Sequence, residues 1–165
     1  MNLLGTFYFV FLFSVVYGAD VCRNGWLRYN ESCYLFSKTP VDWADALAIC
    51  AAFKSQLLEI ETAHEDTFIK NHLRSLHDHD SSPPSGYWMG LNDIEVPDDF
   101  RWVSSDKTAT YVSWYPGQPE GHTHQNCGVL WTPFQFDWGD YFCKDTSLYF
   151  ICEKGSMVDS GEIIG

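Results

Sequence analysis

The sequence predicts an α+β domain in which two helices precede a set of short strands and long loops. Before residue 77, apolar residues recur twice at the spacing of a helix. After residue 86, the apolar runs become short and rich in aromatic and β-branched residues, and Pro, Gly, Asp and Asn separate them. A chain of 165 residues without internal repeats suits one domain with one sizeable core.

The first expected elements are a hairpin and a helix. Residues 22–34 are bounded by cysteines and rich in aromatic residues, which is typical of a short hairpin. Thr39 and Pro40 predict a helix start, because Thr caps helices well and proline fits the first helical position. We expect the residues that follow at helical spacing to face the core. They are Trp43, Ala46, Leu47, Cys50 and Phe53.

A second helix is expected to begin at Thr62, which forms a capping box with Glu65. Its apolar face consists of Phe68, Ile69, His72, Leu73 and Leu76. Between the two helices, residues 56–60 have the pattern of a short strand. Later strands are expected over residues 87–91, 100–103, 128–131 and 149–152.

The stretch from Asn92 to Asn126 holds few regular runs. Loops of this length inside a compact domain usually carry function, so we expect the functional site here. The segment GQPEGHTHQNC, residues 117–127, concentrates amide, carboxylate and imidazole side chains just before a cysteine. It is either a polar surface turn or a set of oxygen ligands for a cation and a polar substrate.

Residues 1–18 are expected to be a cleaved signal peptide. The segment from Leu3 to Tyr17 is almost unbroken apolar sequence, and Val16 and Gly18 are small residues suited to a cut before Ala19. A membrane anchor is disfavoured because the run is short and no Lys or Arg flanks it. No later segment is apolar enough to span a bilayer. We therefore expect a secreted, extracellular protein with one domain over residues 19–154 and a flexible tail over residues 155–165.

All six cysteines follow the expected signal peptide. They are Cys22, Cys33, Cys50, Cys127, Cys143 and Cys152. An even number in an exported chain indicates disulfides, although their number leaves many pairings open. No two cysteines have the two-residue gap of a zinc site. Asn30 begins an Asn-Glu-Ser sequon and is a candidate glycosylation site.

The formal net charge of the chain is −12. Such a surface repels phosphate and makes nucleic acid an improbable partner, whereas divalent cations or a mineral face would be attracted. The sequence holds no Gly-x-Ser-x-Gly elbow and no zinc-protease helix motif, so we do not expect an enzyme. His77, His79, His122 and His124 are alternatives as metal ligands or pH-sensitive groups, but loop histidines are more often simply solvated.

Several short motifs fall in an order that resembles a known family. Residues 88–91, Trp-Met-Gly-Leu, are similar to the family signature Trp-Ile-Gly-Leu, and the segments around Cys22, Cys33, Cys50 and Cys152 have the expected neighbours. From residue 22 to 154 the chain resembles the C-type lectin-like domain in its long, six-cysteine form, and within it the small secreted mollusc lectins called perlucins. The resemblance implies a C-type lectin-like fold of two helices, small antiparallel sheets and a long ligand-binding loop region. The implied disulfides are Cys22–Cys33, Cys50–Cys152 and Cys127–Cys143.

The resemblance also implies a site for calcium and carbohydrate in the long loop, because calcium prefers carboxylate, amide and main-chain oxygens. The implied ligands are Gln118, Glu120, Gln125 and Asp140, with Pro119 as a cis-proline. The Gln-Pro pair matches the type that the family associates with galactose. Three departures are expected to weaken calcium binding: Glu120 replaces Asp, Gln125 replaces Glu, and Gly139 replaces Asn. 

A second, auxiliary metal position is implied at Asp93 and Asn126. Here Asn126 stands where the family usually has Asp, and Pro97 stands where it has an acid. The neighbouring Asp98 and Asp99 are candidates to compensate. We expect this auxiliary position to hold a metal less well than the primary one.

These observations predict a secreted lectin of the galactose type with a weakened calcium site, used in glycan recognition or innate defence. The alternative is a calcium-independent or perlucin-like protein that binds carbonate mineral, extracellular matrix or protein partners. Galactose-binding members of the family add an aromatic ring against the sugar, but no Trp lies between Gln118 and Cys127. His122, His124 and Trp131 are the candidates to replace that ring.

Overall fold

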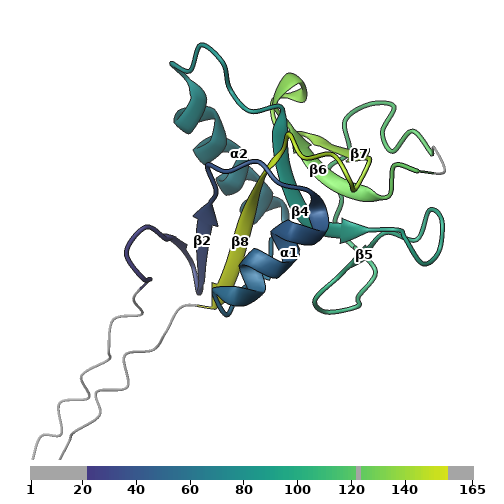
Figure 1. Cartoon of the computed structure of the whole chain (residues 1–165), viewed down its shortest axis with the longest axis horizontal. Helices are drawn as coiled ribbons and strands as arrows, with labels where there is room; N and C mark the ends of the chain where they lie inside the picture. The colour runs from purple at the N-terminus through teal and green to yellow at the C-terminus, as the bar shows by residue number, and fades with distance from the viewer. Residues whose placement is uncertain (1–21, 122–123, 156–165) are drawn as a thin grey trace, which may run out of the picture.

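The structure is a computed structural model that describes residues 22–121 and 124–155. The predicted signal peptide and the tail beyond Gly155 therefore lie outside the described residues. The observed elements confirm the predicted α+β class (Figure 1). In chain order they are β1 (Leu27–Tyr29), β2 (Ser32–Phe36), α1 (Trp43–Ala52), β3 (Gln56–Leu57), α2 (Ala63–His77), β4 (Gly86–Asn92), β5 (Arg101–Trp102), β6 (Cys127–Trp131), the 3-10 helix η1 (Thr132–Phe134), β7 (Trp138–Tyr141) and β8 (Tyr149–Gly155).

The first helix begins three residues later than predicted. Its N-cap is Asp42, whose side chain accepts a hydrogen bond from the N–H of Asp45 at 2.8 Å. Thr39 does not cap the helix, because Val41 is held in an extended bridge whose N–H donates to the Leu148 carbonyl at 3.0 Å. Pairing with a distant segment thus overrides the local start signal. The buried residues of α1 are Trp43, Ala46 and Cys50, as the helical stripe predicts. Leu47 is only partly buried, and the prediction is wrong for Phe53, which follows the last helical residue and is 44% exposed.

The second helix begins at the predicted residue. The hydroxyl of Thr62 accepts a hydrogen bond from the N–H of Glu65 at 3.2 Å. The carboxylate of Glu65 in turn accepts from the N–H of Glu61 at 3.1 Å, one residue earlier than in a standard capping box. Both bonds satisfy N–H groups at the start of α2 and confirm the predicted helix.

The strands form one sheet in the order β1-β2-β8-β4-β6-β7, with β3 paired to β8 and β5 paired to β4. The sequence predicts small antiparallel sheets, and most pairings are indeed antiparallel. Strands β4 and β8, however, run parallel where Tyr87 meets Tyr149 and Trp88 meets Phe150. This contact joins the small sheets into one, and it pairs segments too far apart in the chain for any local pattern to indicate it.

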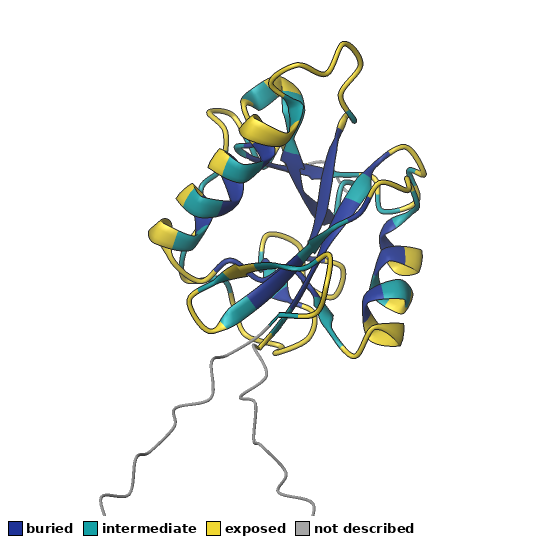
Figure 2. Ribbon diagram, turned by 90° about the vertical axis from the view of Figure 1, so that its left-hand side faces the viewer, coloured by how far each residue is buried: buried dark blue, intermediate teal, exposed yellow. Residues whose placement is uncertain are grey.

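The two helices cover opposite sides of the sheet (Figure 2). Successive side chains of a strand point to opposite faces, so β4 is buried on both. Met89 joins the core cluster that contains Ile69 of α2, whereas Trp88 joins the cluster that contains Trp43 of α1. None of the helices in the described ranges is long and apolar enough to cross a membrane.

The six cysteines pair as the resemblance implies. The disulfides are Cys22–Cys33, Cys50–Cys152 and Cys127–Cys143. The second joins α1 to β8 across a sequence separation of 102 residues. In the chain-entropy model a loop of that length contributes roughly 4–5 kcal/mol to stability. The third joins the start of β6, where the long loop ends, to the segment that follows β7.

A buried polar network holds β7 against α2. Asp66 accepts a hydrogen bond from the indole nitrogen of Trp138 at 2.8 Å and pairs with the ammonium group of Lys70 at 2.7 Å. The same ammonium group lies 2.8 Å from Asp137 and 2.8 Å from the hydroxyl of Ser113. Because Asp137 and Trp138 lie at the start of β7, these contacts fix the strand that carries Asp140.

Candidate functional site

The Gln-Pro segment of the long loop follows a tight turn. The N–H of Gln118 donates to the carbonyl of Tyr115 at 2.8 Å, with Pro116 and Gly117 between them. Gly117 has a φ of 92°, which side chains rarely allow and which suits the third position of a type II turn. The next peptide bond, between Gln118 and Pro119, is cis. The backbone of the predicted ligand Gln118 is thereby held on both sides.

Three of the predicted ligands meet beside β7. The N–H of Glu120 donates to Oδ1 of Asp140 at 3.0 Å, and the N–H of Asp140 donates to Oε1 of Gln118 at 3.2 Å. The side-chain amide of Gln118 donates to Oε1 of Glu120 at 3.2 Å. These bonds bring one amide and two carboxylates from distant parts of the sequence together.

The fourth predicted ligand, Gln125, lines a cavity of about 100 Å³ with Pro119, Asp93, Asn126 and Asp140. Its Oε1 atom is buried, and no group in the described part of the chain donates a hydrogen bond to it. Leaving such an acceptor unsatisfied costs about 1–3 kcal/mol. A residue at the wall of this cavity therefore carries a buried oxygen that a cation or a ligand donor would satisfy.

The carboxyl group of Asp140 is the most buried charge of this cluster, with 3% of the residue exposed. Burial above all raises its pKa, and the charges of Glu120 and Asp93 raise the pKa further. Hydrogen bonds from the backbone N–H groups of Glu120 and Asp140 act in the opposite direction. A nearby cation would favour the ionised form and so relieve the cost of this burial.

Gly139 makes room for the side chain of Trp131. A Cβ atom at position 139 would lie 2.5 Å from Cδ1 of the indole ring and 3.3 Å from Oε1 of Gln118. Gly139 stands where the resemblance implies Asn, and the Trp131 ring fills the space that the Asn side chain would need. An Asn side chain cannot return here unless Trp131 moves.

The predicted auxiliary position is closed by hydrogen bonds. The side-chain amide of Asn126 donates to Oδ1 of Asp93 at 2.8 Å, and the N–H of Asp98 donates to Oδ2 at 2.9 Å. The N–H of Asp93 also donates to the carbonyl of Asn126 at 3.1 Å. Both carboxylate oxygens of Asp93 therefore already have protein donors. Asn126 supplies two of the three bonds, and we name this pair the Asp93–Asn126 clasp.

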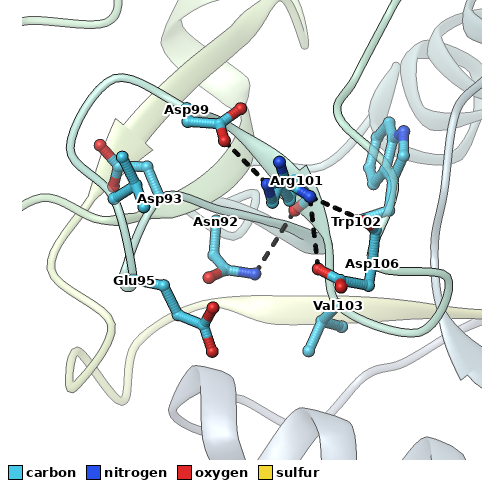
Figure 3. Close-up of a pocket in the computed structure, with 9 residues that line it drawn as sticks. Asn92, Asp93, Glu95, Asp99, Arg101, Trp102, Val103 and Asp106 are labelled. Atoms are coloured by element: carbon cyan, nitrogen blue, oxygen red, sulfur yellow. Dashed lines mark hydrogen bonds and ion pairs between the residues drawn. The ribbon is translucent and has the colours of Figure 1, made fainter.

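A larger pocket of about 230 Å³ lies on the other side of Asp93, between Glu95 and the β5 region (Figure 3). Arg101 partly neutralises its acidic lining. The Nε of Arg101 lies 2.8 Å from Asp99, and its Nη1 lies 3.6 Å from the carboxylate of Asp106. Asp99 is thus engaged with Arg101 rather than with the auxiliary position, where the sequence made it a candidate to compensate.

The donors at the primary cluster are of mixed type. Among residues 22–121 and 124–155, no three His, Cys, Asp or Glu side chains lie close enough together to hold a metal ion. Amide oxygens are not counted among those groups, and here they supply half of the predicted set. Amides and carboxylates are hard oxygen donors, which suit calcium rather than a transition metal. The residues present therefore fit a weak calcium site.

The other singled-out residues lie away from this cluster. Asn30 is exposed in the two-residue turn between β1 and β2, where an attached glycan would have room. His77 lies 2.8 Å from the hydroxyl of Tyr87 and 3.2 Å from Asp80, so its ring packs against the domain. His79 and His124 are exposed. His122 lies outside the described residues.

Sequence reasoning missed two features of the site. The first is the contact of Trp131 with Gly139, which crosses from β6 to β7. A glycine in a strand often marks such a close approach, so the substitution of Gly for Asn was a usable signal. The second is the stack of Tyr115 on Phe134, for which no short-range pattern exists because Tyr115 lies in the long loop and Phe134 ends η1.

The fold agrees with the comparison to known families. The model of the Lectin C-type domain matches residues 39–154, which is most of the chain. The chain therefore belongs to the C-type lectin domain family. Among curated relatives, a Perlucin-like protein of Mytilus galloprovincialis is 30% identical over 131 residues, covering 79% of this chain and 81% of the relative.

Solved structures show the same fold. The carbohydrate-recognition domain of the mouse Scavenger Receptor C-type Lectin is similar with a TM-score of 0.71 and 27% identity, covering 83% of this chain and all of that chain. A calcium-independent type II antifreeze protein is similar with a TM-score of 0.71 and 23% identity, covering 83% of this chain and 96% of that chain. At that identity the second likeness concerns the fold alone.

Proposed function

We propose that the chain is a secreted carbohydrate-binding lectin of the galactose type, in which a weakly held calcium ion helps to bind the sugar. The observation that carries this proposal is the buried Oε1 of Gln125, which has no hydrogen-bond donor in the described chain and belongs to a residue that lines the same cavity as Asp140. The cis bond before Pro119 and the neighbouring cluster support it, because Gln118 and Glu120 both contact Asp140, which lines that cavity.

Each residue has a role in this proposal. Asp140 and Glu120 supply the negative charge, and the amide oxygens of Gln118 and Gln125 supply neutral ligands. A calcium ion held there would supply a point that binds two neighbouring sugar hydroxyls. The Glu120 carboxylate would accept hydrogen bonds from the same hydroxyls, and the Gln118 amide would donate to them or accept from them, so both side chains would orient the sugar. Two carboxylates at the ion predict weaker binding than a site with three.

A bead-binding experiment tests the proposal. The mature chain, residues 19–165, is passed over galactose-bearing and mannose-bearing resins with millimolar calcium, and then with EDTA. We expect retention on the galactose resin and elution by EDTA. Retention on neither resin in calcium would contradict the lectin proposal. Retention that persists in EDTA would show that sugar binding does not need calcium.

The acidic surface favours a second candidate function, binding to carbonate mineral or matrix, because the chain carries a formal charge of −12. This function would use many surface carboxylates rather than one cluster. Replacing both Glu120 and Asp140 by Ala separates the two functions. Mineral binding that survives in this variant would support the second candidate, whereas its loss would assign the mineral contact to the sugar site.

A further inference from the structure

We infer that Asn30 carries an N-linked glycan, which is attached before the hairpin of β1 and β2 closes against β8. The inference rests on the secretion that is part of the proposed function, because this modification belongs to exported chains. It concerns the edge of the sheet that the candidate sugar site does not use.

The acceptor is exposed and has space around it. Asn30 is the only asparagine of the chain that is followed two residues later by Ser or Thr. It lies in the two-residue turn between β1 and β2, with a backbone φ of 49° that asparagine tolerates better than most residues. The turn lines an open hollow of about 670 Å³, so a first sugar on Asn30 meets no steric barrier.

The step is a group transfer from a lipid-pyrophosphate-linked oligosaccharide, made by a transferase of the secretory compartment. The side-chain nitrogen of Asn30 forms a bond to the anomeric carbon of the first sugar. The bond from that carbon to the pyrophosphate oxygen breaks, and the lipid pyrophosphate leaves with the electron pair. The amide nitrogen gives up one proton to a base of the transferase, so atoms and charge balance.

The folded chain hides the part of the motif that the transferase reads. The motif requires a hydroxyl two residues after the asparagine, so the transferase must contact that hydroxyl. In the fold, the hydroxyl of Ser32 donates to the carboxylate of Glu153 at 2.8 Å. Ser32 also pairs with Gly155 of β8, and the next residue, Cys33, is joined to Cys22. The hairpin must therefore be open when the sugar is transferred.

Synthesis from the N-terminus provides an interval in which the hairpin is open. Glu153 follows Ser32 by 121 residues, so at 5–20 residues per second it is made about 6–24 s later. Until then β8 does not exist, and only the Cys22–Cys33 disulfide can hold the hairpin. That disulfide spans 11 residues and forms in seconds or more slowly, so the sugar transfer can precede it.

A glycan on Asn30 leaves the candidate sugar site accessible. Strands β1 and β2 form one edge of the sheet, whereas β7, which carries Asp140, forms the other (Figure 1). The attached glycan therefore projects from the side of the domain away from the long loop. Removing it should not change galactose binding. 

Secretion of the full chain from insect cells tests the site. The wild type, Asn30→Asp and Ser32→Thr are collected from the medium, treated with an amidase that releases N-linked glycans, and compared by mass spectrometry. The matched control is Asn24→Asp, which changes an exposed asparagine outside the motif. We expect the amidase to lower the mass of the wild type, Ser32→Thr and the control, and to leave Asn30→Asp unchanged.

A wild type that is secreted without a glycan would overturn the inference, while the proposed lectin function would stand. A wild type that stays inside the cell would contradict the secretion on which the inference rests, and the inference would fail with it.

A second experiment tests the order of events. The mature chain, made without glycan in bacteria, is incubated with microsomal transferase and the lipid-linked donor, either folded or reduced and unfolded. We expect the folded chain to be modified at least about tenfold more slowly, because transfer must wait for the hairpin to open. Equal rates would overturn the claim that attachment precedes closure of the hairpin.

Discussion

Two adjacent residues of the long loop, Gln125 and Asn126, each stand where the family resemblance implies an acid, and their structural outcomes are opposite. The side-chain amide of Asn126 has hydrogens that an acid lacks and donates one to Asp93 at 2.8 Å. This auxiliary position is therefore closed by a hydrogen bond within the protein. Gln125 keeps an acceptor but finds no donor in the described residues, so its position stays open. Replacing an acid by an amide therefore has two results. At Asn126 the protein itself satisfies the neighbouring carboxylate, whereas at Gln125 an oxygen is left that a metal ion could satisfy.

The two positions also share space, because Asp93 and Asp140 line the same cavity of about 100 Å³. The charge of Asp93 raises the pKa of Asp140, as that of Glu120 does. The Asp93–Asn126 clasp thus supplies both the wall of the open position and part of the negative potential inside it. A cation at the open position would be attracted by three carboxylates, although only two are predicted to touch it.

Of the variants considered, Asp140→Asn should have the largest effect on calcium affinity at the open position. Asn retains an oxygen for the N–H of Glu120 but removes the buried charge, so calcium affinity should fall by at least about tenfold. Retention on galactose resin should be lost with it. Without calcium, stability should not fall, because burial makes the ionised Asp140 unfavourable. 

Calorimetric calcium titration and thermal unfolding in EDTA check this prediction. Glu95→Gln is the matched control, because it changes the net charge equally at an exposed residue of the larger pocket. Equal calcium affinity in the wild type and Asp140→Asn would show that the open position is not the ion site.

Replacing Asp93 by Ala should break the closed position. The amide of Asn126 and the N–H of Asp98 would both lose their acceptor, so the free energy of unfolding should fall by about 1–3 kcal/mol. Denaturant unfolding measures this loss. Because the clasp works without metal, the loss should already appear in full in EDTA. A loss that appears only in calcium would mean that Asp93 is a ligand after all.

Replacing Gly139 by Asn should not restore a stronger ion site by itself. The new side chain would meet the Trp131 ring at 2.5 Å, and overpacking of this kind costs about 1–3 kcal/mol. Adding Trp131→Ala should recover much of the stability and raise calcium affinity above that of the wild type. Thermal unfolding and calcium titration of both variants test this. Higher calcium affinity in the single variant would contradict the coupling of the two residues.

An acid far from the loop separates general pH effects from those of the site. Glu153 is 9% exposed, and burial, then the charge of Glu65, raise its pKa from 4.5 to about 7. The folded protein therefore binds this proton more tightly than the unfolded chain. The stability that results is complete below about pH 4.5 and is lost as the pH rises through about 7. 

Glu153→Gln should flatten this gradual fall between those pH values, in calcium and in EDTA alike. Urea unfolding across the range measures the slope. The hydrogen bond from the hydroxyl of Ser32 at 2.8 Å can pass to the amide oxygen, so the variant should fold. An unchanged slope would place the titrating group elsewhere.

Local signals predicted elements whose causes are local. The start of α2 follows from Thr62 and Glu65, which lie three residues apart and contact each other. The start of α1 could not be predicted in the same way, because Val41 forms a β-bridge with Leu148, which is far away in the sequence. The parallel pairing of β4 with β8 was missed for the same reason.

At the site, the family resemblance indicated which residues would meet, and its implied disulfides are present. It could not indicate which hydrogen bonds and packing contacts the substituted residues would make. Whether Asn126 donates or accepts depends on where Asp93 lies, and whether position 139 has room depends on Trp131. These are contacts between segments, so they emerge only once the loop is folded against β6 and β7.

We expect the Gln125 position to be open to calcium and the Asn126 position to be closed by the protein itself. A calorimetric titration of the mature chain with calcium tests this difference. We predict one ion per chain, lost in Asp140→Asn and unaffected by Glu95→Gln. A second ion that disappears when Asp93 is replaced would show that the clasp opens to bind metal. No binding at millimolar calcium would show that the open position does not hold the ion.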